Sequence, residues 1–281
     1  MKILVTGGAG FIGSNLIKKL VSEGHRVVSL DNYSTGDKKN HVEGVKYINC
    51  DIEQLEYIKG DYDLCYHLAA QSRVQPSFDD PTECLRVNVK GTETVMEWAR
   101  HNNIKVVYAG SSSKHHDPSD SPYAMYKYLG EEVCKLYKKT YNVNVEICRF
   151  YNVYGPGESL DEKYGSVIGI WRTKVSKIEA LPIVGDGEQR RDFIHVDDIV
   201  DGLYRIGLVD NKHEDAWELG SGVNYSINEI YRWFNEKFWI ESTYVPEQKG
   251  NYRETLNTNT DTKDRLGWEP KDRLKDYILG L

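Results

Sequence analysis

A glycine-rich turn at Thr6–Gly13 is the feature that most constrains the fold of this chain. It directly follows the short apolar run Ile3–Val5 and precedes Phe11–Glu23, whose apolar residues recur at helical spacing. A second apolar run, Arg26–Leu30, follows that helix. A strand, a glycine turn, a helix and a second strand form a βαβ unit, whose parallel strands lie in a sheet covered on both faces. The first thirty residues therefore predict an α/β fold.

The same alternation continues further along the chain. We expect strands at 46–49, 64–68, 106–108 and 145–150 and helices at about 81–102 and 121–141. Strict alternation of strand and helix predicts a doubly wound parallel sheet. The alternation of strand and helix patterns ends after Asn152, where Gly155–Gly157 predicts a turn. We expect one domain over residues 1–165, a smaller lobe over 166–281, and a return of residues 190–208 to the first domain.

Charge and cysteine content narrow the class of protein. The 36 Lys and Arg residues against 43 Asp and Glu residues give a net charge of −7, without a long basic run. This argues against nucleic-acid or membrane partners. The first apolar run is too short for a signal or membrane segment. The scattered cysteines without a Cys-x-x-Cys pair predict reduced thiols in a cytoplasmic protein; they are Cys50, Cys65, Cys84, Cys134 and Cys148.

The glycine turn has the pattern of a dinucleotide-binding site. Gly7 permits a tight turn, Gly10 lets the backbone approach a pyrophosphate, and Gly13 allows the helix to pack on the strand. Asp31 ends the second strand 18 residues after Gly13. Its carboxylate is placed to accept hydrogen bonds from both ribose hydroxyls and would repel a 2′-phosphate, so NAD is favoured over NADP.

Two other interpretations of this region are open. The glycines alone are also compatible with a flexible strand-to-helix turn. Lys38 and Lys39 favour NADP slightly, although a lysine pair in a polar loop is more often solvated surface. We interpret the region as an NAD site because strand, glycines, helix and Asp31 occur in the required order.

Tyr123 and Lys127 form a candidate catalytic pair. Their i, i+4 spacing places the phenol and the ammonium on one helix face, where a cation lowers the pKa of a nearby phenol. Ser111 follows an expected strand and would lie at the carboxyl edge of the sheet, where it could relay a proton. The alternative is an ordinary surface pair, since the chain has 20 tyrosines.

These motifs together resemble the extended short-chain dehydrogenases/reductases of the NAD-dependent nucleotide-sugar epimerase/dehydratase family. The resemblance covers nearly the whole chain. It is carried by Thr6–Gly13, Asp31–Asn32, Cys50–Ile52, His67–Ala70, Asn88–Thr92, Ser111, Tyr123, Lys127, Arg149–Pro156, Gly185–Val196 and Leu266–Pro270. It implies a Rossmann doubly wound sheet with a smaller C-terminal substrate-binding lobe.

The resemblance also implies roles for individual residues. Asp51 and Ile52 would contact adenine, and Lys127 would also bond the nicotinamide ribose. The other expected cofactor contacts are Phe11, Ile12, Asn32, Leu68, Ala69, Ala70 and Gln71. Ser112 and Asn152 are expected to contact the substrate, Asn152 at its diphosphate.

Arg191 is expected to pair with phosphate or ribose, as a bidentate and permanently charged group can. The alternative role for Arg191 is a salt bridge to Asp192 or Asp197. His195 beside Asp197 does not have metal-ligand spacing, so we interpret Asp197 as a helix cap and expect no metal.

The residues after Ser111 favour one reaction within the family. Dehydratases and decarboxylases carry an acid just after the catalytic Ser or Thr, whereas this chain has Ser112 and Ser113. The resemblance then implies C4 epimerisation of a UDP-hexose or UDP-N-acetylhexosamine through a 4-keto intermediate, with Tyr123 as the base. A dehydratase, decarboxylase or reductase, and a non-catalytic NAD-binding protein, are the alternatives.

The chain departs from the family at three places. Only 11 residues separate Ser111 from Tyr123, where relatives have a longer loop that helps to wall the sugar pocket, so we expect a more open pocket here. Near the C-terminus Asn251 stands where an arginine is usual. Arg253 is expected to replace that arginine, and the alternative is that the contact is lost. Thr258 stands where a bulky residue excludes N-acetylated sugars, so its small side chain favours them. The helices at 81–102 and 121–141 correspond to those of a family dimer interface, and we expect a homodimer.

Overall fold

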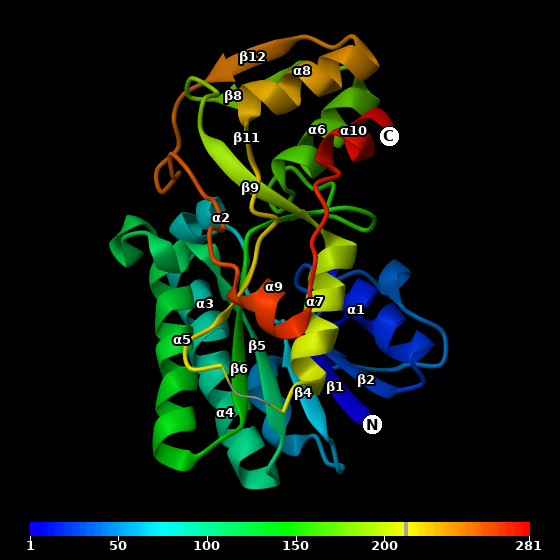
Figure 1. Cartoon of the computed structure of the whole chain (residues 1–281), viewed down its shortest axis with the longest axis vertical. Helices are drawn as coiled ribbons and strands as arrows, with labels where there is room; N and C mark the ends of the chain where they lie inside the picture. Colours follow the sequence, from blue (N-terminus) through cyan, green and yellow to red (C-terminus); the bar gives the residue numbers. More distant parts are fainter. Residues whose placement is uncertain (211–212) are drawn as a thin grey trace.

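A seven-stranded, wholly parallel sheet forms the centre of the computed structural model, which describes residues 1–210 and 213–281 (Figure 1). The chain starts in the middle of this sheet and winds outward in both directions, which is the doubly wound Rossmann arrangement. The strands in spatial order are β10 (Trp217–Leu219), β6 (Val145–Phe150), β5 (Lys105–Ser111), β4 (Leu64–His67), β1 (Lys2–Thr6), β2 (Arg26–Asp31) and β3 (Lys46–Asn49). The predicted fold class is confirmed.

Helices cover both faces of the sheet. On one face α1 (Phe11–Ser22) packs beside α7 (Val196–Leu208), and on the other α4 (Gly91–Asn102) packs beside α5 (Pro122–Tyr141). Successive side chains of β1 alternate between the two cores: Ile3 and Val5 belong to the first core and Leu4 to the second. This two-sided burial explains why the strands read as continuous apolar runs.

The expected helix at 81–102 is present but is not uniform. It consists of α3 (Pro81–Leu85), a π-helical turn (Arg86–Lys90) and α4. The short helix α2 (Val74–Asp79) precedes it. Short 3₁₀ helices occupy Lys38–Asn40, Ile52–Tyr57, Ser112–His115 and Pro118–Asp120.

The smaller lobe lies beyond the carboxyl ends of the parallel strands, at the top of Figure 1. Its core includes Trp171, Phe234 and Ile278. Its two small sheets contain β11 (Asn224–Ser226), β9 (Arg190–His195) and β7 (Asn152–Tyr154), and β12 (Ser242–Val245) with β8 (Leu181–Val184). Its helices are α6 (Val167–Lys177), α8 (Ile227–Phe238) and α10 (Leu274–Leu279).

The chain returns from the lobe to the large sheet more often than expected. The helix α7 returns, but β9 stays in the three-stranded sheet of the lobe. The strand β10 joins the large sheet beside β6, and α9 (Asp261–Leu266) packs near β10. A three-residue strand has too few positions for a periodic signal. The helix α7 is capped by His195, whose Nδ1 accepts from the Asp197 amide at 3.2 Å, so Asp197 is not the cap.

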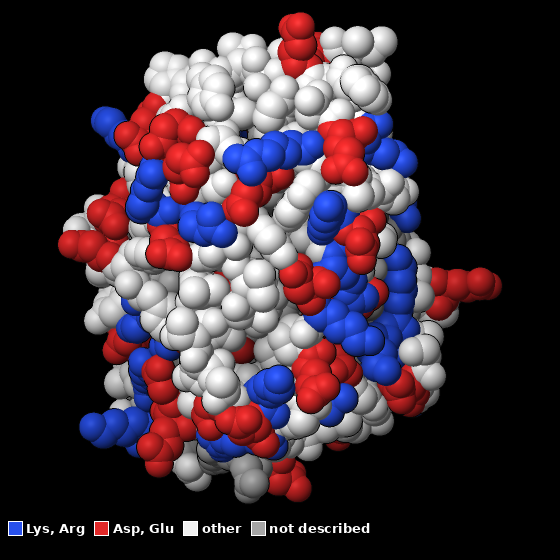
Figure 2. All heavy atoms as spheres, turned by 45° about the horizontal axis from the view of Figure 1, so that its top comes forward, with Lys and Arg blue, Asp and Glu red and all other residues white. Residues whose placement is uncertain are grey.

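Two further observations concern the surface charge and the apolar length of the helices. On the face drawn in Figure 2 acidic and basic side chains are intermingled. Among the described residues no helix has the length and apolar character needed to cross a bilayer.

Candidate active site

A cavity of about 1020 Å³ lies between the carboxyl edge of the large sheet and the lobe. The large sheet and its helices contribute the glycine turn, Ser111, Tyr123 and Lys127, and the lobe contributes Arg191 among others. The segment 246–257, which we call the strap, descends from β12 toward α9 along the cavity (Figure 1). One space therefore brings together most of the residues that the sequence analysis selected.

The three glycines of the turn have different surroundings. Gly7 has φ +71°, and an added Cβ would lie 2.8 Å from the Ala69 amide nitrogen. At Gly13 a Cβ would lie 2.2 Å from the Gly7 carbonyl oxygen. At Gly10 a Cβ would meet only that carbonyl, at 3.2 Å, and would otherwise project into open space beside the cavity. Close packing thus accounts for Gly7 and Gly13, whereas at Gly10 the free space is available to a ligand.

The start of α1 is suited to an anion. Its N-cap is Gly10, no side chain caps it, and no acidic residue lies in its first turn. Its first amides, near Phe11 and Ile12, therefore retain their hydrogen-bonding capacity and the positive end of the helix dipole. Phe11 and Ile12 both line the cavity.

Asp31 is held rigidly at the end of β2. One carboxylate oxygen accepts from the Ala9 amide at 2.9 Å and the other from the Tyr33 amide at 2.8 Å. The side chain is buried and lines the cavity. Because each oxygen keeps a free lone pair, the carboxylate can still accept from ribose hydroxyls.

Asn32 and Asp51 meet at the same end of the cavity, where the Asn32 amide donates to Asp51 at 3.0 Å. Arg86, on the π-helical turn, binds both Asp51 oxygens at 2.9 and 3.1 Å and lowers the pKa of Asp51 to about 2. Ile52 follows and also lines the cavity. Sequence reasoning missed Arg86 because nothing in the local pattern reveals a partner 35 residues away.

The loop after β4 supplies Leu68, Ala69, Ala70 and Gln71 to the cavity. Asn88 holds this loop through both backbone groups of Gln71: its oxygen accepts from the Gln71 amide at 2.9 Å, and its nitrogen donates to the Gln71 carbonyl at 3.0 Å. The side-chain oxygen of Gln71 is buried and has no partner among the described residues. A buried acceptor beside a cavity fits a ligand that brings its own donor.

The candidate catalytic groups are in contact. The Tyr123 hydroxyl donates to the Ser111 hydroxyl oxygen at 3.3 Å. The Ser113 hydroxyl and amide donate to the same oxygen at 3.0 and 3.2 Å. Ser111 ends β5, and Tyr123 lies in the first turn of α5, which Ser121 caps. The caps fix both backbones, so the pair is positioned without a ligand.

Lys127 lies one turn after Tyr123 and is buried. Its Nζ donates to the Ala109 carbonyl and lies 4.7 Å from the centre of the Tyr108 ring. Burial lowers the pKa of Lys127 to about 8. Burial also raises the pKa of Tyr123, while the Ser111 hydrogen bond and the charge of Arg73 lower it. The cation that favours the Tyr123 phenolate here is therefore Arg73, which the sequence analysis did not select.

Ser112 and Asn152 both line the cavity. The Asn152 amide nitrogen donates to the Asp192 carbonyl at 3.1 Å and to the Thr255 hydroxyl at 3.3 Å. It thereby joins β7 and β9 to the strap, and its side-chain oxygen faces the same region without a hydrogen bond to another described residue.

Arg191 has no acidic partner among the described residues. It donates to the Arg190 carbonyl at 2.8 Å and to the Asn251 side chain. The carboxylate of Asp192 accepts instead from Ser221, Gly222 and Asn257. The salt bridge to Asp192 or Asp197 is thus not formed. Burial lowers the pKa of Arg191 to about 10, and such a half-buried cation suits an anionic ligand.

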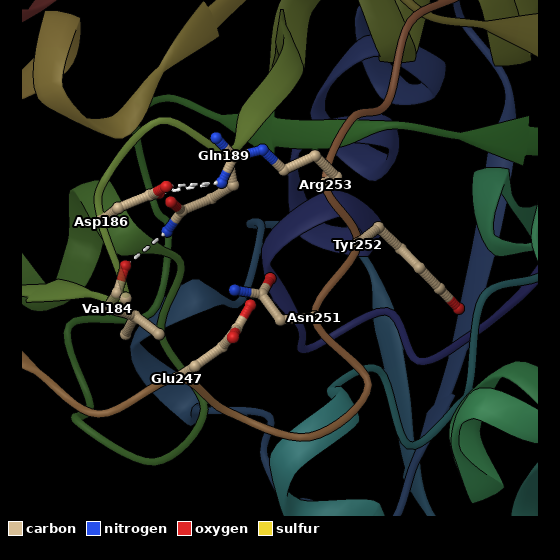
Figure 3. A pocket seen from close by; sticks show the side chains of 8 residues that line it. Val184, Asp186, Gln189, Glu247, Asn251, Tyr252 and Arg253 are labelled. Carbon is tan, nitrogen blue, oxygen red and sulfur yellow. Dashed lines mark hydrogen bonds and ion pairs between the residues drawn. The ribbon is translucent and has the colours of Figure 1, made fainter.

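Arg253 does not reach the large cavity. Two thirds of its side chain is exposed, and it pairs with Asp186 at 2.8 and 2.9 Å. It borders a smaller adjoining pocket of about 260 Å³, in which Arg253 and its neighbour Tyr252 point in opposite directions (Figure 3). The strap residue that contacts Arg191 is Asn251. Thr258 is exposed and outside the residues that line the cavity, so it does not govern space there.

A buried ion network around Arg149 contacts the 3₁₀ turn that follows Ser111. Arg149 on β6 binds Glu131, Asp215 and Glu218 at 2.9 to 3.0 Å. Glu218 also accepts from His115, which ends the 3₁₀ turn that begins at Ser112, at 2.9 Å. Sequence reasoning missed this network, because its members are far apart in the chain.

The comparisons with known proteins agree with this fold and site. Residues 3–220 match the model of the NAD dependent epimerase/dehydratase family. A UDP-glucose 4-epimerase of Mycolicibacterium smegmatis is 31% identical over 304 residues, which are 99% of this chain and 96% of that protein. The chain belongs to the NAD-dependent epimerase/dehydratase family, and the cofactor is NAD.

Solved structures add detail. A UDP-glucose 4-epimerase with UDP-glucose from Thermotoga maritima is 28% identical, with a TM-score of 0.92 and coverage of 99% of this chain and 96% of that chain. A UDP-glucuronic acid 4-epimerase from Bacillus cereus, in complex with UDP-glucuronic acid and NAD, is 26% identical, with a TM-score of 0.90 and the same coverages. Other similar proteins are named UDP-glucuronic acid decarboxylases and a dTDP-glucose 4,6-dehydratase.

Proposed function

We propose that this protein is a UDP-sugar C4 epimerase. The observation that carries the proposal is the contact of Tyr123 with Ser111 at 3.3 Å, beside a cavity lined by the glycine turn. Tyr123, as phenolate and through Ser111, removes the proton of the C4 hydroxyl. NAD, held by the glycine turn and Asp31, would supply the reversible acceptance of the C4 hydride. After the 4-keto sugar has rotated, Tyr123 returns the proton to the C4 oxygen.

The cofactor contacts proposed from the resemblance fit the residues present. The open space at Gly10 and the uncapped start of α1 suit a pyrophosphate. Asp31 would accept from ribose hydroxyls, and Asn32, Asp51 and Ile52 would border adenine. Lys127 would bond the nicotinamide ribose, whereas Arg73 is the cation that lowers the pKa of Tyr123. The unpaired Gln71 oxygen offers a further acceptor from the loop after β4, which also lines the cavity.

The substrate diphosphate is assigned to the lobe side of the cavity. Arg191 is a half-buried cation without an acidic partner among residues 1–210 and 213–281, and Asn152 lies on the adjoining strand. Relatives named for UDP-glucose and UDP-glucuronic acid support UDP as the nucleotide. Because Thr258 does not line the cavity, its small side chain gives no reason to prefer an N-acetylated hexose over a plain one.

Ser112 and Ser113 favour epimerisation over the reactions of the related decarboxylases and dehydratases. Those reactions need proton transfer at a second carbon, and neither serine is a strong acid or base. The Ser113 hydroxyl is already used to orient Ser111. The minimal chemistry is reversible oxidation at one carbon.

We also propose a homodimer in the cytoplasm. The helices α4 and α5 lie together on one face of the sheet, and Leu136 and Tyr141 on α5 are each about half exposed (51 to 53%). Trp98 on α4 is buried and belongs to the core rather than to such an interface. All five cysteines are free, which suits a reducing compartment.

The test is to incubate the purified protein, without added cofactor, with UDP-, dTDP- and GDP-sugars and to separate the products by isomer-resolving chromatography with mass detection. A new peak of unchanged mass is expected from a UDP-sugar. Loss of water or carbon dioxide would replace the proposal with a dehydratase or decarboxylase. Bound NAD without any product would favour a non-catalytic protein.

A further inference from the structure

Arg73 is a cation in the cavity that lowers the pKa of Tyr123 but to which the proposed mechanism assigns no ligand. It occupies the N-cap position of α2, is half-buried, and lines the cavity. Its Nε donates to the Tyr164 carbonyl oxygen at 2.8 Å, which fixes the plane of the guanidinium. Among the described residues, the two terminal nitrogens have no hydrogen-bond partner and the side chain forms no ion pair.

The charge of Arg73 is not neutralised by its neighbours. Glu158 is the acid that acts on Arg73, but its carboxylate accepts from Ser166 at 2.8 Å and from Arg172 at 3.1 Å. Burial lowers the pKa of Arg73 because the charged form loses water. A half-buried guanidinium with free donors therefore has unsatisfied capacity for an anion.

The position of Arg73 identifies the end of the substrate that it would face. Arg73 is the N-cap residue of α2, and the Ser77 hydroxyl oxygen on this helix accepts from the Tyr123 amide at 3.1 Å. Arg191 instead lies on β9 and donates to the side chain of Asn251 in the strap. In a pyranose ring C1 and C4 lie on opposite sides. When C4 faces Tyr123, the diphosphate on C1 is directed away from Tyr123, to the side assigned to Arg191. Arg73 is then at the C4 end of the ring, where C6, carried by C5, is the group that can be a carboxylate.

We propose that Arg73 binds a carboxylate at C6, and that the substrate of this enzyme is a UDP-hexuronic acid. The proposal rests on the proposed epimerase function and specifies its substrate. The planar guanidinium matches a carboxylate through two parallel N–H···O bonds, whereas the hydroxymethyl group of a neutral hexose offers one uncharged oxygen. A carboxylate thus satisfies the donors that a neutral sugar leaves without a charge partner.

The test compares UDP-glucuronic acid with UDP-glucose on the wild-type protein and on Arg73→Gln. The wild-type protein should have the higher kcat/KM for UDP-glucuronic acid. In Arg73→Gln, kcat/KM for UDP-glucuronic acid should fall about 10- to 100-fold, mainly through KM, because a charged hydrogen bond is lost. The KM for UDP-glucose should change much less, while loss of the Arg73 charge near Tyr123 should lower kcat for both sugars alike. Calorimetric titration of each UDP-sugar gives the same comparison without turnover.

Two further variants serve as controls. Arg73→Lys keeps the charge but not the fork and should recover part of the lost affinity. Lys163→Gln removes another cation from the cavity rim, one that already pairs with Asp79 at 3.2 Å, and should leave the preference unchanged.

The inference about Arg73 and the proposed function can fail separately. Equal losses with both sugars, or loss of bound NAD from Arg73→Gln, would assign Arg73 to catalysis or to the cofactor and overturn the inference. Turnover of UDP-glucose without turnover of UDP-glucuronic acid would also overturn it and leave the epimerase function intact. No turnover of any sugar would overturn the epimerase function itself.

Discussion

Tyr252 lies flat against His116, with ring centroids 3.8 Å apart and ring planes 7° from parallel. The contact joins the short segment between Ser111 and Tyr123 to the strap, and therefore joins the catalytic serine loop to residues on the substrate side. The short loop is thus closed against the lobe by an aromatic stack, although the sequence suggested a more open pocket.

His116→Ala should weaken substrate binding without affecting chemistry. Loss of an aromatic pair corresponds to about 0.5 to 1.5 kcal/mol, so KM for the UDP-sugar should rise about two- to tenfold while kcat changes little. Steady-state kinetics measure both values. His101→Ala, on the exposed side of α4, is the control. An unchanged KM would show that the stack does not help to form the substrate site.

Tyr123→Phe should abolish turnover and retain NAD. The substitution removes only the hydroxyl that contacts Ser111, and loss of a general base typically lowers kcat by a factor of about 100 or more. The measurements are kcat and the NAD released from denatured protein. Tyr126→Phe on the same helix is the control. Full activity of the Tyr123 variant would refute its assignment as the base.

Gly10→Ala and Gly13→Ala should separate cofactor binding from folding. A methyl group at Gly10 would meet only the Gly7 carbonyl, at 3.2 Å, which a small shift relieves, so the melting temperature of NAD-free protein should fall little while bound NAD is lost. At Gly13 the methyl group would collide with the Gly7 carbonyl at 2.2 Å, and overpacking of this kind destabilises by about 1 to 3 kcal/mol. NAD content and thermal unfolding measure the two effects. A destabilised Gly10 variant that keeps NAD would contradict the assignment.

Lys127→Met should produce a more stable but inactive protein. The pKa of Lys127 is lowered from 10.5 to about 8, so burying its charge costs on the order of 3 kcal/mol at neutral pH. Between pH 8 and pH 10.5 the unfolded chain holds a proton that the folded chain has lost, and this residue's contribution to stability rises with pH. The advantage of the Met variant should therefore shrink toward pH 10.5. Denaturant unfolding at several pH values measures it, and a variant less stable at pH 7 would contradict the argument.

Arg149→Leu should be strongly destabilising. Removing this cation leaves Glu131 and Glu218 buried without their partner, which costs about 3 to 5 kcal/mol. Arg100→Leu removes an arginine from an exposed ion pair with Glu97 and should have little effect. Denaturant unfolding compares the two variants, and similar small losses would mean that water reaches the Arg149 network.

The sequence predicted those parts of the molecule that depend on local periodicity and short motifs. The glycine turn, Asp31 and the Tyr123–Lys127 spacing belong to regular elements, whose geometry fixes which side chains share a face. The strap is irregular, so no period fixes its register, and Arg253 and Thr258 lie outside the lining of the large cavity. Arg73, Arg86 and Arg149 depend on partners brought together only by the tertiary fold.

The repeated passage of the chain between the large sheet and the lobe has a consequence for how this protein can be divided. The strand β10 forms one edge of the sheet and α7 covers part of one face, yet both follow lobe segments in the chain. A fragment that ends near residue 165 would lack that edge and would expose the apolar face beneath α7. The large domain and the lobe therefore cannot be exchanged separately between relatives. A change of substrate has to arise by substitutions within the whole chain.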